Sequence, residues 1–175
     1  MTTHIEPADP ARLTELADVA AHTFPLACPP STRPRDVADF LAANLSSSRF
    51  ADYLNDPDRS VLTAVEDGRI IGYAMIIRGV PDVAVARAVV VRPAVELSKM
   101  YVLPEAHGAG VSAALMSAAL HHATTLEAAC VWLGVNKQNL RAQRFYAKHG
   151  FTITGTRNFR LGTHLEHDYV LVRRA

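Results

Sequence analysis

The sequence predicts a single α/β domain whose sheet is mixed, mostly antiparallel, and flanked by helices. Three observations carry this prediction. The chain has 175 residues, which is enough for one sizeable core. Two apolar, β-branched runs within residues 60–79 flank Asp67-Gly68, a strong signal for a hairpin. The order strand, helix, strand across residues 94–135 predicts a parallel pair joined by a right-handed crossover.

The first third of the chain predicts two helical regions separated by an irregular segment. Apolar residues recur at helical spacing within residues 8–22 and again within residues 35–54. Residues 24–34 read FPLACPPSTRP, and we expect a loop there because proline fixes φ and removes a backbone donor. The Val/Ala-rich segment 80–91 fits no one class, so its structure stays open.

The second half of the chain alternates buried strands with helices. Residues 94–103 and 129–135 are apolar runs typical of buried strands. A helix over residues 139–150 ends on a glycine, which suits a helix C-terminus. Two last strands are expected near residues 151–157 and 166–173. The helix between the two buried strands has one apolar face, made of Val111, Ala114, Leu115, Ala118 and Ala119.

Composition and charge favour a globular protein without nucleic-acid or membrane partners. Apolar residues make up 49% of the chain, charged residues 20%, and the formal net charge is only +1. The sequence has no apolar run long enough to cross a bilayer. The N-terminus lacks a basic stretch followed by an apolar one, so we expect no signal peptide and a cytoplasmic location.

The cysteines and histidines do not predict a metal site. Cys28 and Cys130 have no CxxC spacing, and Cys130 lies in an apolar run typical of a core thiol. His164 and His167 supply two ligands, whereas a structural zinc site takes four. We therefore expect no bound metal.

The segment PEAHGAGVSAAL at residues 104–115 raises the question of a phosphate-bearing cofactor. Its Gly108-Ala109-Gly110-Val111-Ser112-Ala113 fits the dinucleotide fingerprint G-x-G-x-x-A. However, four residues separate the strand from the first glycine, and no acid follows the next strand. The Gly-Lys-Ser/Thr of a P-loop is also missing. Amides at a helix N-terminus still suit an anion, so an anion site and an ordinary glycine-rich turn both stay open.

Three segments together resemble the GCN5-related N-acetyltransferases, an acetyl-CoA-dependent superfamily: ELSKMYVLP, HGAGVS and NLRAQRFYAKHGF. The superfamily's loop pattern is Q/R-x-x-G-x-G/A. Here it is His107-x-x-Gly110-x-Ser112, which departs from the pattern at both ends. The stretch VWLGVNKQNLRAQRFYAKHGF and the tail FRLGTHLEHDYVLVR are most similar to the PaiA-like spermidine/spermine acetyltransferases. The resemblance runs from about residue 60 to the end.

This resemblance implies a GNAT fold in one domain over residues 1–175, with a central, splayed parallel strand pair. Residues 1–57 would form a helical acceptor-side region and residues 94–150 the acetyl-CoA-binding core. The strands at 94–103 and 129–135 would separate to admit the pantetheine arm of acetyl-CoA. A homodimer stays open.

The resemblance also assigns cofactor contacts. The amides of Met100 and Val102, on either side of Tyr101, would pair with the pantetheine arm, and the Met100 amide would face the acetyl oxygen. Asn139 would contact the same arm, although Asn also suits a helix N-cap. The pyrophosphate would lie on the loop beside His107, held by the amides of Gly108, Ala109, Gly110, Val111 and Ser112.

Two residues match catalytic positions of the superfamily. Glu96 lies four residues before Met100, so period-two alternation predicts that it shares that face of the strand. The resemblance implies that it acts as general base. A strand-end acid paired with Lys or Arg is the alternative. Tyr146 matches the tyrosine that protonates the leaving CoA thiolate, and a core aromatic is its alternative. Asn136 is a weaker candidate for the cofactor region.

The acceptor is expected to be a primary amine on a small molecule, entering over residues 23–57 and 80–91. A polyamine is favoured by the acids in the helical region, although arginines are interleaved with them. A protein N-terminus or lysine is the next choice. A non-catalytic CoA-binding regulator is the alternative from another class. The acids are Asp36, Asp39, Asp52, Asp56 and Asp58.

Overall fold

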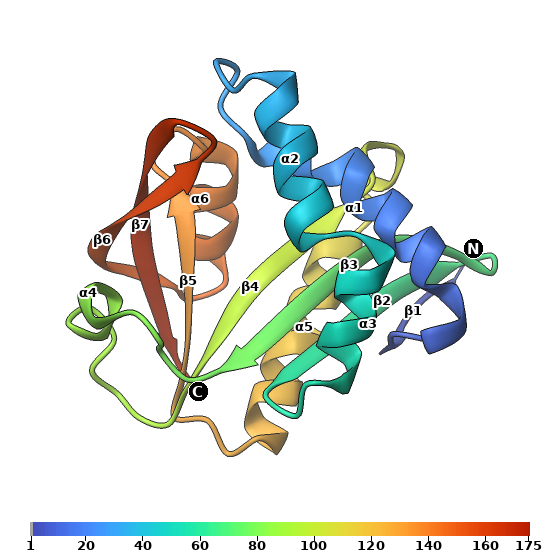
Figure 1. Ribbon diagram of the computed structural model, residues 1–175. Coiled ribbons are helices and arrows are strands. Elements are labelled where there is room, and N and C mark those ends of the chain that lie inside the picture. Colours follow the sequence, from blue (N-terminus) through green and yellow to red (C-terminus); the bar gives the residue numbers. More distant parts are fainter. Residues whose placement is uncertain (1) are drawn as a thin grey trace.

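The computed structural model describes residues 2–175 and shows one seven-stranded sheet with helices on both faces (Figure 1). The strands follow the order β1-β2-β3-β4-β5-β7-β6 across the sheet. Among the described strands only β4 and β5 run parallel, which confirms the predicted mixed α/β sheet. The strands are β1 (Thr3–Pro7), β2 (Arg59–Glu66), β3 (Arg69–Arg78), β4 (Ala94–Val102), β5 (Cys130–Asn136), β6 (Thr152–Leu161) and β7 (His164–Arg174). The helices are α1 (Leu13–Ala27), α2 (Pro34–Asn44), α3 (Ser47–Asn55), α4 (Val83–Ala86), α5 (Val111–Thr125) and α6 (Leu140–Lys148).

The hairpin predicted around Asp67-Gly68 is confirmed. Both residues have positive φ, 51° and 75°, as the tight turn between β2 and β3 requires. Strand β1, which pairs antiparallel with β2 at the sheet edge, was not predicted. Its five residues are too few to show a period, so residues 1–57 are not wholly helical as expected.

The loop expected at residues 24–34 is wrong over its first four residues, because α1 continues to Ala27. Pro25 lies in the last turn of the helix, where a missing N–H removes one hydrogen bond and leaves the preceding turns intact. The Cys28 amide then donates to the Pro25 carbonyl oxygen at 3.2 Å and closes the helix. This extension carries Phe24 and Cys28 toward the centre of the molecule.

Neighbouring residues of β3 show that the helices cover opposite faces of the sheet. The Tyr73 ring contacts the Phe50 ring of α3, with 5.6 Å between centroids. A side chain on the adjacent Gly72 would instead meet Leu115 of α5. Since successive strand residues point to opposite faces, α3 and α5 lie on opposite sides, and α1 packs beside α3. No helix within the described residues is both long and apolar enough to span a membrane.

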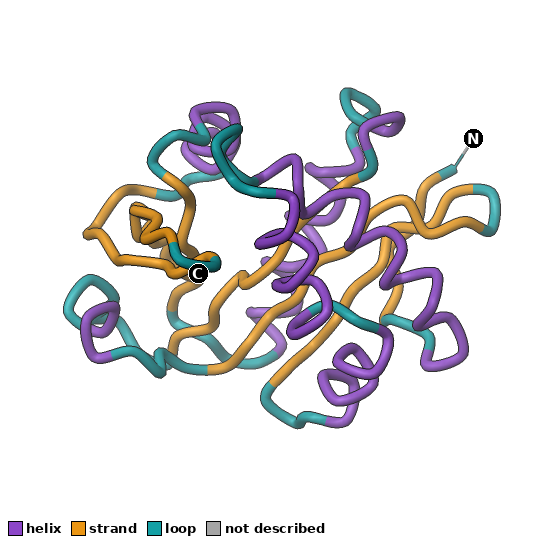
Figure 2. The backbone as a smooth tube through the Cα atoms, turned by 45° about the horizontal axis from the view of Figure 1, so that its top comes forward, coloured by secondary structure: helices purple, strands orange, loops and turns teal. Residues whose placement is uncertain are grey.

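The sheet opens between β4 and β5. Their parallel pairing covers only Ala94–Cys130, Val95–Val131 and Glu96–Trp132, after which both strands continue without pairing to each other. Figure 1 shows β4 and β5 diverging, and Figure 2 shows the two resulting groups of strands. This confirms the splayed parallel pair expected from the resemblance.

Candidate active site

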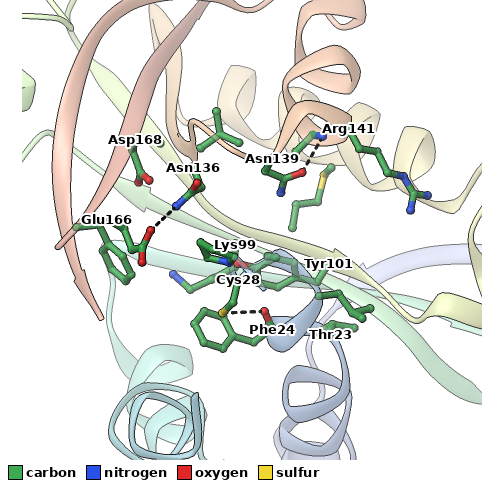
Figure 3. Close-up of a pocket in the computed structure, with 18 of the residues that line it drawn as sticks. Thr23, Phe24, Cys28, Lys99, Tyr101, Asn136, Asn139, Arg141, Glu166 and Asp168 are labelled. Atoms are coloured by element: carbon green, nitrogen blue, oxygen red, sulfur yellow. Dashed lines mark hydrogen bonds between the residues drawn. The ribbon is translucent and has the colours of Figure 1, made fainter. Parts of the chain in front are cut away.

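The gap between β4 and β5 leads into a cavity of about 310 Å³. Figure 3 shows the cavity between the start of α6, which carries Asn139 and Arg141, and the end of α1, which carries Phe24 and Cys28. The splayed parts of β4 and β5 also line it, over residues 98–102 and 134–136. Two elements that are far apart in sequence therefore face each other across the opened sheet.

Backbone direction along β4 leaves free amides in the gap. The Leu103 amide donates to the Ile71 carbonyl oxygen of the β3 side at 2.8 Å. Because alternate residues of a strand direct their N–H and C=O groups to opposite neighbours, the amides of Met100 and Val102 point away from β3. They point into the gap, as an arm pairing with β4 would need.

The β4–α5 loop has unused donors at the start of α5. Gly108 and Gly110 adopt φ of 82° and 81°, a conformation that favours glycine. Among residues 2–175, no acceptor pairs with the amides of Gly108, Gly110, Val111 or Ser112. Of the predicted loop residues, His107 and Ser112 reach the cavity wall, whereas residues 108–111 lie outside it.

His107 replaces the usual Gln or Arg of this loop and connects it to α6. Its Nε2 lies 2.8 Å from the Val102 carbonyl oxygen, and its Nδ1 lies 3.3 Å from Arg141 Nη2. The arrangement fits the neutral tautomer in which Nε2–H donates to Val102 and Nδ1 accepts from Arg141. Arg141 therefore places a guanidinium beside the loop position at which the superfamily pattern has Gln or Arg.

Helix α6 presents the predicted residues to the cavity. The Asn139 side chain accepts from the Ala142 amide at 3.1 Å, so it caps the helix while it lines the cavity. Phe145 and Tyr146 line the same cavity from one helix face, as the spacing predicted. Burial raises the pKa of Tyr146 to about 12. The phenol is therefore protonated at neutral pH and able to donate.

Glu96 lies on a different face of β4 from the one predicted. Tyr73, Met75 and Ile77 alternate along β3 on the face covered by α1 and α3, and their β4 partners are Tyr101, Lys99 and Glu96. The pairing skips Ser98, which forms a β-bulge. The extra residue interrupts period two, so the expectation that Glu96 shares the face of Met100 is wrong. Glu96 shares the face of Lys99.

The negative charge of the Glu96 carboxylate is partly compensated by Arg157. Its Oε2 lies 3.8 Å from Arg157 Nη1, and Arg157 Nε donates to Asp168 at 3.2 Å. Burial raises the pKa of Glu96 against the opposing pull of Arg157, Lys99 and Arg59. Glu96 does not itself line the cavity, whereas its partner Arg157 does.

The β6–β7 hairpin forms a cavity wall that was not predicted. It contributes Arg157, Phe159, Leu161, Glu166 and Asp168. The Arg157 side chain can cross β5 toward β4 because Gly134 has no Cβ, since a Cβ there would overlap the Arg157 guanidinium. Alternating residues along β6 and β7 indicated that some charged side chains point inward. The sequence did not show that they reach across β5.

Part of the region expected at the acceptor entry lines the cavity. The end of α1 and Phe40 of α2 line the cavity. Segment 80–91 does not line the cavity. Its residues Val85 and Val89 pack in a separate apolar cluster with Trp132 and Val170, because α4 lies against β6. Four of the five acids that favoured a polyamine are paired with the interleaved arginines: Asp36 with Arg33, Asp39 with Arg35, Asp52 with Arg49, and Asp56 with Arg59.

Comparison with known proteins identifies the class to which this fold and cavity belong. A family model described as "Acetyltransferase (GNAT) family" matches residues 20–151. Uncharacterized N-acetyltransferases of Mycobacterium tuberculosis (strain H37Rv) and Mycobacterium bovis are 59% identical over 159 residues, covering 91% of this chain and 95% of theirs. The chain belongs to the GNAT acetyltransferase family, and its cosubstrate is acetyl-CoA.

Solved structures share the fold at low sequence identity. PaiA N-acetyltransferase from Thermoplasma acidophilum, solved in complex with coenzyme A, superposes with a TM-score of 0.79 at 17% identity, over 100% of both chains. Ribosomal-protein-alanine N-acetyltransferase from Brucella melitensis gives 0.72 at 20% identity, over 98% of this chain and 99% of the other. At these identities the likeness concerns the fold and leaves the acceptor undefined.

Proposed function

We propose that the protein transfers the acetyl group of acetyl-CoA directly to the primary amine of a small molecule. The observation that carries this proposal is the gap between β4 and β5, which opens into a cavity lined by Tyr146. The free amides of Met100 and Val102 suit the pantetheine arm, and those at the start of α5 suit the pyrophosphate.

The residues around the cavity suit each step of the transfer. The Met100 amide would donate to the thioester oxygen, which becomes negative as the amine attacks. Glu96 would take the amine proton through a water molecule, since it lies beside the cavity wall and burial raises its pKa. The C–S bond then breaks, and Tyr146 would give its proton to the leaving CoA thiolate.

The acceptor side supports a small amine better than a polyamine in particular. Four aspartates that favoured a polyamine form ion pairs with neighbouring arginines. Support for a polyamine therefore comes from the PaiA-like sequence segments alone. A protein N-terminus or lysine is the second choice.

A thiol-release assay tests the proposal. Purified protein is given acetyl-CoA with polyamines, amino acids, aminoglycosides or peptides, and free CoA is measured together with the acetylated product. Acetylation of one small-molecule class is expected. Tight acetyl-CoA binding without turnover on any acceptor would instead favour a non-catalytic CoA-binding regulator.

A further inference from the structure

Within residues 2–175, three charged side chains that line the cavity lack an ion partner: Arg141, whose guanidinium contacts His107, and the two described next, Lys99 and Glu166. Lys99 Nζ donates to the Ser98 carbonyl oxygen at 3.2 Å and to Ser98 Oγ at 3.3 Å. Within residues 2–175, no carboxylate oxygen lies within 4.0 Å of this ammonium group. Glu166 accepts from Asn136 Nδ2 at 3.2 Å and likewise has no cation within that distance. The cavity thus holds a cation and an anion that do not neutralise each other.

The other charges on the same wall are already paired. Arg157 contacts both Glu96 and Asp168, so none of these three is free for a ligand. Burying an unpaired charge is unfavourable, and a ligand group of opposite sign removes that penalty. Lys99 and Glu166 are therefore the two charged cavity groups best placed to take a ligand.

Both groups belong to the acceptor half of the cavity. Lys99 lies on the face of β4 that α1 covers. Burial and, after it, the nearby charge of Glu166 raise the pKa of Cys28 at the end of α1, so Glu166 lies close to this thiol. Figure 3 shows Lys99, Glu166 and Cys28 around the same part of the cavity. The hydrogen bond from Asn136 to Glu166 holds this carboxylate at the end of β5, beside the gap.

Aromatic rings fill the wall beside these charges. Phe24 and Phe40 are stacked, with 4.4 Å between ring centroids, and Phe159 meets Phe40 edge-on at 5.8 Å. All three line the cavity. Such a wall suits an apolar or aromatic side chain of a ligand, because its burial removes apolar surface from water.

We propose that the acceptor is an amino acid with an apolar or aromatic side chain, whose ammonium group binds Glu166 and whose carboxylate binds Lys99. The inference rests on the proposed function and narrows its substrate class. A plain amine would leave Lys99 unpaired. A polyamine would bring a second ammonium toward Lys99, and like charges repel.

Matched acceptors test this proposal. L-phenylalanine is compared with phenethylamine, and L-leucine with 3-methylbutylamine, because each pair differs by one carboxylate. We expect kcat/KM for the amino acid to be about 10-fold higher or more, the discrimination that one charge-assisted hydrogen bond provides. Equal values, or a preference for the decarboxylated amine or for spermidine, would overturn the proposal.

Variants assign the preference to Lys99. Lys99→Met should lower the ratio of kcat/KM for L-phenylalanine to kcat/KM for phenethylamine by about 10-fold or more, whatever its effect on the two separate values. Lys99→Arg should keep the preference, since it keeps a cation. Lys148→Met, the same substitution at an exposed position on α6, is the matched control and should change nothing. An amino-acid preference that survives in a folded Lys99→Met protein would contradict the assignment.

Binding separates this inference from the proposed function. Calorimetry of L-phenylalanine with the CoA complex measures acceptor affinity without turnover, and Glu166→Gln should weaken it. Glu6→Gln, at a half-buried carboxylate on the edge strand β1 outside the cavity, should not. Amino-acid binding that depends on Lys99 but leads to no acetylation would support the site and reject the transferase proposal. Acetylation of spermidine without any amino-acid binding would support the transferase and reject this site.

Discussion

Tyr146 is the residue whose assigned chemistry can be tested with the smallest change. Tyr146→Phe removes one hydroxyl from a ring that packs against Phe145 and Phe151. We expect turnover to fall on the order of 10²-fold, the usual contribution of a positioned general acid. Stability should fall by about 1 kcal/mol or less, the value of one hydrogen bond. Steady-state rates and thermal melting measure both, and full activity would make Tyr146 a packing residue.

If Glu96 is the base, the reaction rate should depend on pH in a specific way. A base must be ionised to act, and burial raises the pKa of Glu96, so the rate should begin to fall on acidification above the ordinary carboxylate range. Glu96→Gln should lower kcat on the order of 10²-fold and remove this acid limb, with little effect on acetyl-CoA affinity. A pH–rate profile measures it. A near-native rate with the acid limb intact would leave Glu96 as the ion-pair partner of Arg157.

At the level of residues, sequence reasoning found what local motifs contain. Ala142, Phe145 and Tyr146 lie within one helix, so their shared face followed from spacing and is confirmed, as all three line the cavity. The face of Glu96 was missed because one bulged residue, Ser98, shifts the alternation. The sequence did not show that Lys99 and Glu166 line one cavity, because this depends on how β7 lies beside β5, which no local pattern encodes.

The β4–α5 loop makes a prediction at the level of an element. Gly110→Asp places a carboxylate where the pyrophosphate is expected, and we expect CoA binding to be abolished by charge repulsion and by the left-handed backbone at this position. Calorimetry with CoA measures it. Gly68→Asp is the control, because Gly68 is also left-handed with open space around its Cβ position but lies in the β2–β3 turn. Retained CoA affinity, or new affinity for NAD, would refute the assignment of this loop.

Strand β5 depends on the missing side chain of Gly134. Gly134→Ala would push aside the Arg157 guanidinium and leave the buried Asp168 without its cation. We expect the free energy of unfolding to fall by about 3 kcal/mol, the typical cost of leaving a buried charge unpaired. Denaturant unfolding measures the loss. Arg157→Ala combined with Gly134→Ala should cost less than the sum of the two single changes, and strict additivity would disprove the overlap.

Elements with strong local signals were predictable, and those defined by their neighbours were not. The β2–β3 hairpin and the β4–α5–β5 unit followed from Asp67-Gly68 and from period changes in the sequence. Strand β1 is stabilised by pairing with β2 rather than by a pattern of its own. The last turn of α1 is helical although it contains Pro25, because the packing of Phe24 on Phe40 outweighs the loss of one backbone hydrogen bond.

On the scale of the whole molecule, two groups of strands are joined within the sheet by only three residue pairs between β4 and β5. Bound acetyl-CoA would add a further contact between these groups by pairing with β4 inside the gap. It should therefore stabilise the whole fold by mass action, by about 2.7 kcal/mol at a concentration of 100 times its Kd. Thermal melting with and without acetyl-CoA measures this effect, and no shift at saturation would contradict binding to the folded state.

The position of the arm can be read from hydrogen exchange along β4. The amides of Met100 and Val102 point into the gap, so we expect acetyl-CoA to slow their exchange strongly. The Leu103 amide already donates to Ile71 and serves as an internal control that should change little. Adenosine 3′,5′-bisphosphate, which lacks the pantetheine arm, should leave Met100 and Val102 unprotected. Exchange measured by NMR distinguishes these outcomes. Protection of Leu103 alone, or equal protection of the gap amides by the bisphosphate, would show that the cofactor does not pair with β4.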